Sequence, residues 1–115
     1  MSQELNEIIL NALEDLKGKD IVSLDVSELT DVMDTLVIAS GTSNRHVKSL
    51  ASNVVQEAKD RGIAAIGVEG LDTGEWVLAD FGDTVVHVMM PSTRDFYDLE
   101  KLWSMEPGTR TQDSE

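Results

Sequence analysis

Residues 75–103, EWVLADFGDTVVHVMMPSTRDFYDLEKLW, decide the fold of this 115-residue chain. Two valine-rich segments of alternating polarity, Glu75–Phe81 and Thr84–Met90, are predicted to be β-strands. Only Gly82 and Asp83 separate them, and a glycine at the first position of a two-residue loop is typical of a type II′ hairpin turn. We therefore expect an antiparallel hairpin.

The hairpin turn fixes which side chains share a face of the sheet. If Phe81 pairs with Thr84, the pairs that follow are Ala79–Val86, Val77–Val88, Leu78–His87 and Trp76–Met89. Because side chains alternate along a strand, one face is entirely apolar and is expected to meet the core: Val77, Ala79, Phe81, Val86 and Val88. The other mixes large hydrophobic residues with an acid and an imidazole: Trp76, Leu78, Asp80, Val85, His87 and Met89. This second face is either covered by another element or presented to a partner.

The composition bounds the class of protein. The length is that of one domain, and a hydrophobic content of 41% suits a globular fold. The absence of cysteine excludes disulfides and thiolate metal sites. No apolar run approaches the roughly 20 residues of a membrane helix, and the acidic N-terminus is unlike a signal peptide. We expect a soluble cytoplasmic protein that does not bind a membrane.

The charge is strongly acidic, with 9 basic and 22 acidic residues and a net charge of −13. Such a surface repels phosphate backbones, so direct DNA binding is not expected. One interpretation of the charge is solubility. The other is electrostatic steering toward a basic protein partner, in which case association should slow as ionic strength rises.

Apolar residues at helical spacing predict three helices. The first spans residues 3–17, with Ser2 as its cap, Gly18 as the left-handed residue at its end, and a buried stripe of Leu5, Ile8, Ile9, Ala12, Leu13 and Leu16. The second spans residues 44–61, is capped by Thr42 or Ser43, ends at Gly62, and buries Val47, Leu50, Ala51, Val54, Val55 and Ala58. The third is capped by Ser92, with Asp95 completing a capping box, and turns Phe96, Leu99, Leu102 and Trp103 inward.

Three further strands complete the predicted sheet. They span residues 21–26, 35–40 and 66–69, and the second of them has a run buried on both faces. The order of strand 35–40, helix 44–61 and strand 66–69 predicts a right-handed crossover between two parallel strands. The whole is a single α/β domain with a mixed sheet and the order αββαβββα. Residues 104–115 are expected to be a disordered tail.

Signals for catalysis are weak. Residues 41–46 could bind phosphate at a helix N-terminus, but with one glycine they lack a nucleotide-binding fingerprint, and capping explains them as well. Asp80 and Asp83 could hold a metal ion, yet they flank a turn that favours Asp structurally. A hydrogen bond between Asp80 and His87 is a better expectation than a metal site. No catalytic residue, metal or cofactor is predicted.

Residues 16–103 resemble the ribosomal silencing factor family, also called RsfS or Iojap-like. The matching segments are LKGKDIVSLDV, LVIASGTSNRHVKSLASNVV, GVEG, EWVLADFGDTVVHVM and RDFYDLEKLW. The most specific part is W-V-x-x-D-x-G-D-x-V-V-H-V followed by R-x-x-Y-x-L-E-x-L-W. Residues 1–103 would form the family domain. The family fold is similar to nucleotidyltransferases, but the carboxylate pair that holds their metals does not follow Gly41 and Thr42 here.

The resemblance implies a cytoplasmic, non-enzymatic factor. Such a factor binds the large ribosomal subunit through large-subunit ribosomal protein fourteen, blocks joining of the small subunit, and represses translation under nutrient limitation. The resemblance also implies that two residues contact the ribosomal protein: Trp76, and Phe81, the hydrophobic residue before the turn glycine. Since the register puts Phe81 on the core face, Phe81 would reach a partner from the strand end. The predicted partner-binding residues are Trp76, Leu78, Asp80, Phe81, His87 and Met89.

Three hypotheses follow from the sequence. The leading one is a ribosome-binding factor that acts by occlusion. The alternative is a metal-dependent nucleotidyltransferase-like enzyme using Asp80 and Asp83. The third is a homodimer formed through the Trp76 face, which could coexist with the first if the dimer and the ribosome complex compete for one surface.

Overall fold

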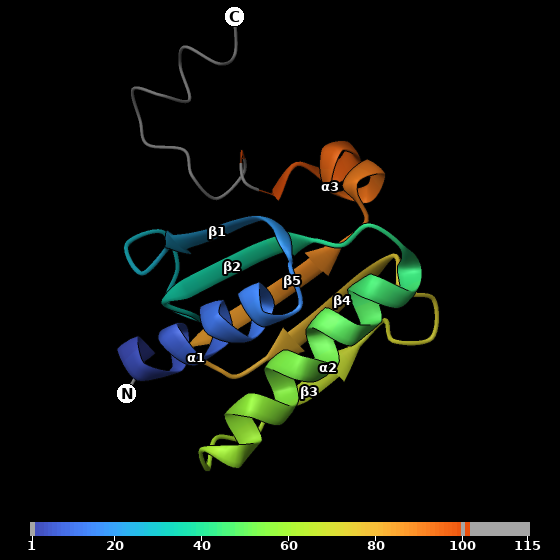
Figure 1. Ribbon diagram of the computed structural model, residues 1–115. Coiled ribbons are helices and arrows are strands. Elements are labelled where there is room, and N and C mark those ends of the chain that lie inside the picture. The colour runs from blue at the N-terminus through green and yellow to red at the C-terminus, as the bar shows by residue number, and fades with distance from the viewer. Residues whose placement is uncertain (1, 100, 102–115) are drawn as a thin grey trace, which may run out of the picture.

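The computed structural model describes residues 2–99 and 101, which form one α/β unit of helices and a five-stranded sheet (Figure 1). The predicted fold class and the order αββαβββα are confirmed. The elements are α1 (Ser2–Asp15), β1 (Lys19–Asp25), β2 (Thr35–Ser40), α2 (Asn44–Asp60), β3 (Gly67–Glu69), β4 (Trp76–Asp80), β5 (Thr84–Met89) and α3 (Pro91–Tyr97). The predicted tail, together with Leu102 and Trp103, lies outside the described residues.

The sheet is mixed, with the strand order β1-β2-β5-β4-β3. β2 and β5 run parallel at its centre, and the other neighbours are antiparallel. It follows that β2 and β3 point in the same direction, as the crossover prediction requires, with β5 and β4 between them. The two central strands are the most buried: in β2, residues Leu36 to Ala39 are fully buried, which confirms the prediction of burial on both faces.

The hairpin register is confirmed. β4 and β5 pair as Trp76 with Met89, Val77 with Val88, Leu78 with His87 and Ala79 with Val86. Gly82 has a φ of +94°, as a type II′ turn requires at its first central position. The carbonyl oxygen of Asp83 then accepts hydrogen bonds from the amides of Asp34 and Thr35, which attaches the turn to the start of β2.

One face of the sheet is covered by α1 and α2, which lie side by side (Figure 1). The larger core lies there, and its fully buried side chains include Ile9, Leu13, Leu50, Val54, Val77, Val86 and Val88. α2 begins where predicted, since the Ser43 hydroxyl accepts a hydrogen bond from the amide of His46 at 3.1 Å. This face therefore follows the apolar patterns read from the sequence.

The opposite face carries a smaller core, formed by Val26, Leu36, Ile38 and Met89. Partly buried hydrophobic residues surround it: Leu24, Met33, Trp76, Val85 and Leu99. The seven-residue helix α3 lies against one end of this face, where Tyr97 contacts Trp76 and Arg94 bonds to Ser40. The second face is thus only partly covered, by α3 at one end.

The end of α1 departs from the prediction. The helix stops at Asp15, so Leu16 is exposed instead of belonging to the buried stripe. The left-handed residue is Lys17, with a φ of +63°, and not Gly18. A Cβ atom at Gly18 would lie 3.1 Å from the carbonyl oxygen of Leu13, a tight contact that glycine avoids.

The predicted cap of α3 is also wrong. Pro91 is already helical, the cap position is Met90, and no side chain caps the helix. Proline is favoured at the first helical position because its φ is preset and its missing N–H has no helical partner there. The helix therefore begins before Ser92. Phe96, which was predicted to face inward, is exposed.

Candidate partner-binding face

The structure brings five of the six predicted partner-binding residues onto one face of the hairpin. Trp76, Leu78 and Asp80 on β4 are half-buried. On β5, His87 is only 8% exposed and Met89 is fully buried in the smaller core. Trp76, Leu78 and Asp80 are therefore the more accessible members of the set, while His87 and Met89 lie next to them on β5 and are buried.

Trp76 is held in a defined orientation. Its indole Nε1–H donates a hydrogen bond of 2.9 Å to Nδ1 of His87, and the two rings are 5.9 Å apart. On its other side the ring of Tyr97 lies 4.7 Å away, tilted by 48°. The hydrogen bond requires an unprotonated Nδ1, and burial lowers the pKa of His87 from 6.5 to about 4. The imidazole is therefore a neutral acceptor at physiological pH.

The predicted hydrogen bond between Asp80 and His87 is wrong. The Asp80 carboxylate accepts a hydrogen bond of 2.8 Å from the amide of Gly82, two residues further along. This local bond closes the hairpin turn, a role that Asp side chains commonly take. His87 instead pairs with Trp76, whose indole donor the register places one diagonal step away on the same face.

Phe81 does not share the face of Trp76. It is half-buried and packs against the larger core, on the side of α1 and α2, as the register predicts. Its amide donates to the carbonyl oxygen of Thr84 at 2.9 Å, which fixes it at the mouth of the turn. Any contact of Phe81 with a partner of the Trp76 face must therefore be made around the end of the strand.

Sequence reasoning did not find the contribution of α3 to this face. Tyr97 is 53% exposed and packs on Trp76, and Phe96, 79% exposed, stands edge-on to Tyr97 at 5.0 Å. The signal that could have revealed it is Asp98, which adopts a left-handed φ of +50° and ends the helix. Asp tolerates this conformation better than most residues. A helix ending there cannot continue the apolar stripe assumed for Phe96.

The loop before α2 uses its amides internally. The Thr42 amide donates to Nδ1 of His46 at 2.9 Å, and Nε2 of the same ring donates to the carbonyl oxygen of Leu16 at 2.7 Å. With the Ser43 cap, these bonds account for the polar pattern that resembled a phosphate loop. They also join the start of α2 to the end of α1.

Within the described residues, no group of three or more His, Asp or Glu side chains is arranged to hold a metal ion.

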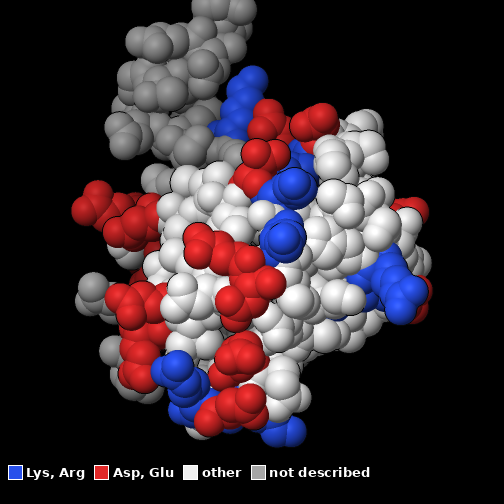
Figure 2. Space-filling model, in the orientation of Figure 1, with Lys and Arg blue, Asp and Glu red and all other residues white. Residues whose placement is uncertain are grey.

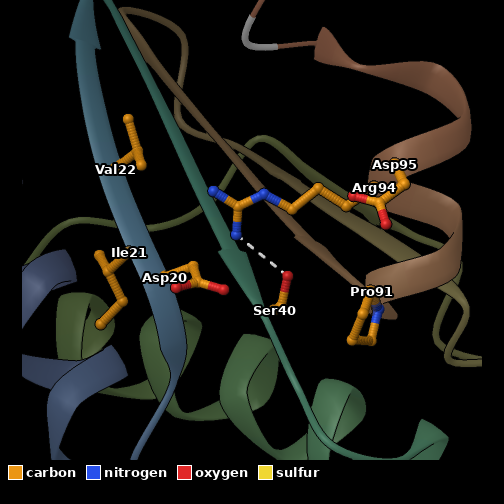
Figure 3. Close-up of a pocket in the computed structure, with 7 residues that line it drawn as sticks. All are labelled: Asp20, Ile21, Val22, Ser40, Pro91, Arg94 and Asp95. Carbon is orange, nitrogen blue, oxygen red and sulfur yellow. Dashed lines mark hydrogen bonds between the residues drawn. The ribbon is translucent and has the colours of Figure 1, made fainter.

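A pocket of about 490 Å³ lies between β1 and α3 (Figure 3). Arg94 crosses it from α3, and its Nη1 donates to the Ser40 hydroxyl at 3.0 Å. The lining residues are Asp20, Ile21, Val22, Ser40, Pro91, Arg94 and Asp95. Because Arg94 is 7% exposed and bonded to β2, its guanidinium acts here as an anchor for α3.

Charge is unevenly spread over the molecule. On the face seen in Figure 2, carboxylates gather over α1 and the β1–β2 loop, and basic side chains lie in separate groups at both ends of α2 and between α1 and α3. The exposed acids of this region are Glu4, Glu7, Glu14, Asp15, Asp25, Glu28, Asp31 and Asp34. Among the described helices, none is long and apolar enough to cross a membrane.

A partly exposed tryptophan held by the buried His87 and the exposed Tyr97 is of the residue type most enriched at protein-binding hot spots. The comparisons with known proteins show which family the chain belongs to. The whole chain, residues 1–115, matches the family described as "Ribosomal silencing factor during starvation". A ribosomal silencing factor from Chromobacterium violaceum is 52% identical over 101 residues, covering 88% of this chain and 83% of that one. One from Haemophilus influenzae is 40% identical over 100 residues, covering 87% and 98%.

The fold matches as well. A crystal structure of a protein from Chromobacterium violaceum superposes with a TM-score of 0.88 at 50% sequence identity, covering 91% of this chain and 88% of that chain. The chain belongs to the ribosomal silencing factor family, as the sequence motifs indicated. Membership makes it a regulator of translation that associates with the large ribosomal subunit.

Proposed function

We propose that this chain silences ribosomes by occlusion. In this proposal it binds large-subunit ribosomal protein fourteen through the Trp76 face and blocks joining of the small subunit, which represses translation when nutrients are limiting. The action needs no covalent chemistry, because a bound domain excludes the small subunit by its volume alone. The protein would act in the cytoplasm, where ribosomal subunits join.

The orientation of Trp76 is the observation that carries the proposal. Trp76 is partly exposed, and its indole is hydrogen-bonded to the buried imidazole of His87 and packed against Tyr97. A ring held in one rotamer loses little conformational entropy on binding, which favours affinity. Leu78 and Asp80 lie beside it on the same strand face and add apolar area and a polar rim.

The acidic charge supports a basic protein as the partner. With a net charge of −13, the chain is repelled by bare RNA and attracted to positively charged protein surfaces. We expect the association rate with large subunits to fall by about tenfold between low and physiological salt, measured by stopped-flow light scattering. A rate independent of ionic strength would remove electrostatic steering from the proposal and leave the binding itself intact.

The decisive experiment measures subunit joining. Purified large subunits are incubated with the parent chain, small subunits and magnesium are added, and joining is followed by light scattering. We expect the parent to block joining and Trp76→Ala to restore it, since hot-spot tryptophans commonly contribute about 2 kcal/mol or more. Val32→Ala, which truncates an exposed apolar residue in the β1–β2 loop, should block joining as the parent does.

A second variant separates binding from folding. Trp76→Phe keeps an aromatic ring beside Tyr97 but removes the donor to His87 and part of the ring area. It should fold as the parent does, by circular dichroism, and block joining with reduced potency. If the parent sediments with large subunits and yet permits joining, occlusion is the wrong mechanism.

A further inference from the structure

α3 contacts both ends of one row of side chains on the second face of the sheet. In the register, Ser40 on β2 pairs with Met89 on β5, and Met89 pairs with Trp76 on β4. Directly paired residues share a face, so these three side chains form a row across three strands. At one end of the row, Nη1 of Arg94 donates to the Ser40 hydroxyl at 3.0 Å. At the other end, the rings of Tyr97 and Trp76 lie 4.7 Å apart.

The spacing of the two contact residues on α3 suits these two tasks. Arg94 and Tyr97 are three residues apart, and residues three apart on a helix project from neighbouring positions. The ends of the row are two strand spacings apart, which is about 10 Å. The long side chain of Arg94 spans much of this distance, since it reaches from α3 to Ser40 on β2 (Figure 3). One helix therefore connects an inner strand of the sheet to the strand that carries Trp76.

The position of α3 depends on such ties. A helix of seven residues has little stability of its own. Its start is held by the Met90 amide, which donates to the carbonyl oxygen of Glu75 at 3.0 Å. Beyond that point the buried contact is the one between Arg94, 7% exposed, and Ser40, 2% exposed. Arg94 is therefore placed to fix the helix against the sheet.

The indole of Trp76 has a contact on each side. Its hydrogen bond to Nδ1 of His87 fixes one edge of the ring, and a ring held at one point can still rock about it. The ring of Tyr97 limits this movement from the side of α3. We propose that Arg94 and Tyr97 are positioning residues for Trp76: Arg94 fixes α3 on β2, and α3 holds Tyr97 against the indole. The inference rests on the proposed function, in which Trp76 is the main contact with the partner.

Burial makes Arg94 the sharper of the two residues to test. At 7% exposed it has too little surface to serve as a contact residue, so its effect on binding must pass through its neighbours. Tyr97 is 53% exposed and has enough free surface to touch a partner as well.

The test combines NMR of the indole N–H groups with binding to purified large ribosomal subunits, measured as a dissociation constant by sedimentation. The chain has two tryptophans, and the signal that is lost in Trp76→Phe belongs to Trp76. Arg94→Met keeps a long side chain without donors. It should shift or broaden the Trp76 signal and weaken binding about two- to tenfold, because the ring must then be ordered on binding. Arg94→Lys retains a donor and should restore part of both.

Val54→Ala is the matched control for a loss of stability. Val54 is fully buried in the larger core, on the opposite face of the sheet from α3. Its truncation should lower the free energy of unfolding and leave the Trp76 signal and the dissociation constant unchanged. If Arg94→Met behaves as Val54→Ala does, Arg94 only stabilises the fold, and the positioning role is overturned.

Tyr97→Ala tests the second step, and it also decides the matter if Arg94→Met does not fold, because an exposed side chain is lost at little cost. It should move the Trp76 signal and weaken binding about two- to tenfold. An unmoved signal would show that Tyr97 does not hold the ring. A moved signal with an unchanged dissociation constant would show that the orientation of the ring does not affect binding. Either result overturns the inference.

The failure of the inference and that of the proposed function give different results. If the parent binds, Trp76→Ala does not, and both Arg94→Met and Tyr97→Ala bind as the parent does, the positioning role falls while the proposed function stands. If the parent itself does not bind large subunits, the proposed function falls, and the inference that rests on it falls too.

Discussion

The two faces of the sheet differ in how much of their apolar surface is buried. The face under α1 and α2 is a continuous core in which Leu50, Val54, Val77 and Val86 are fully buried. The opposite face has four buried apolar residues, and its periphery includes Trp76 and Val85, which stay half-buried. The face under α1 and α2 therefore supplies most of the stability. The opposite face leaves hydrophobic side chains partly exposed, which costs the fold little stability.

The same substitution on each face tests this difference and should give the largest contrast. Leu50→Ala opens a cavity in the larger core and should lower the free energy of unfolding by about 3 kcal/mol. Leu78→Ala removes a half-buried side chain from the other face and should cost about 1 kcal/mol. Urea unfolding followed by circular dichroism measures both. Equal losses would mean that the two faces contribute equally to stability.

The buried His87 should give the Trp76 face a pH response. Its pKa is about 4 in the folded chain and 6.5 in the unfolded one, so the unfolded chain binds more protons between these values. The free energy of unfolding should therefore fall as the pH drops below 6.5, by about 2 kcal/mol at pH 5. His87→Gln retains an acceptor for Trp76 and does not titrate.

The comparison of parent and His87→Gln isolates this effect, since the carboxylates titrate in both. Urea unfolding at pH 7 and pH 5 should show a difference between the two proteins that grows on acidification. A constant difference would show that the imidazole titrates alike in the folded and unfolded chains.

A smaller effect is expected where the helices of the first face are joined. His46 accepts from the Thr42 amide and donates to the carbonyl oxygen of Leu16, so it links α2 to the end of α1. His46→Ala should lower the free energy of unfolding by about 1 kcal/mol, the net value of such bonds. Ser49→Ala, an exposed change on α2, should have almost no effect, and an equal loss in both would show that the link does not stabilise the fold.

The accuracy of sequence-based prediction also differs between the faces. The hairpin was predicted to its register because Gly82 specifies the turn, and one residue of slip would expose Val77 and Val86. The stripe of α2 was equally clear, because its apolar residues repeat over seventeen residues and Ser43 caps its start. Turn type, helix capping and apolar spacing are local properties of the sequence, and burial reinforces them. These two elements can therefore be predicted from the sequence alone.

The errors lie at the end of α1 and on the second face of the sheet, including α3. Phe96 was placed inward because a longer helix was assumed, whereas Pro91 starts the helix early and Asp98 ends it after seven residues. The partner of His87 was missed because Trp76 and Asp80 share its face, and only the geometry decides which of them reaches the ring. Arg94 was not singled out, since burial of a charged side chain through Ser40 depends on tertiary contact.

The edges of the sheet bear on how copies of this chain can meet. β1, at one edge, is interrupted by a bulge between Lys19 and Val22, where Asp20 takes a left-handed φ of +49°. β3, at the other edge, is three residues long. Irregular, charged or very short edges discourage strand addition between molecules, a common route to aggregates. Copies concentrated in one compartment are therefore expected to stay separable, and any dimer would form through side chains instead of a shared sheet.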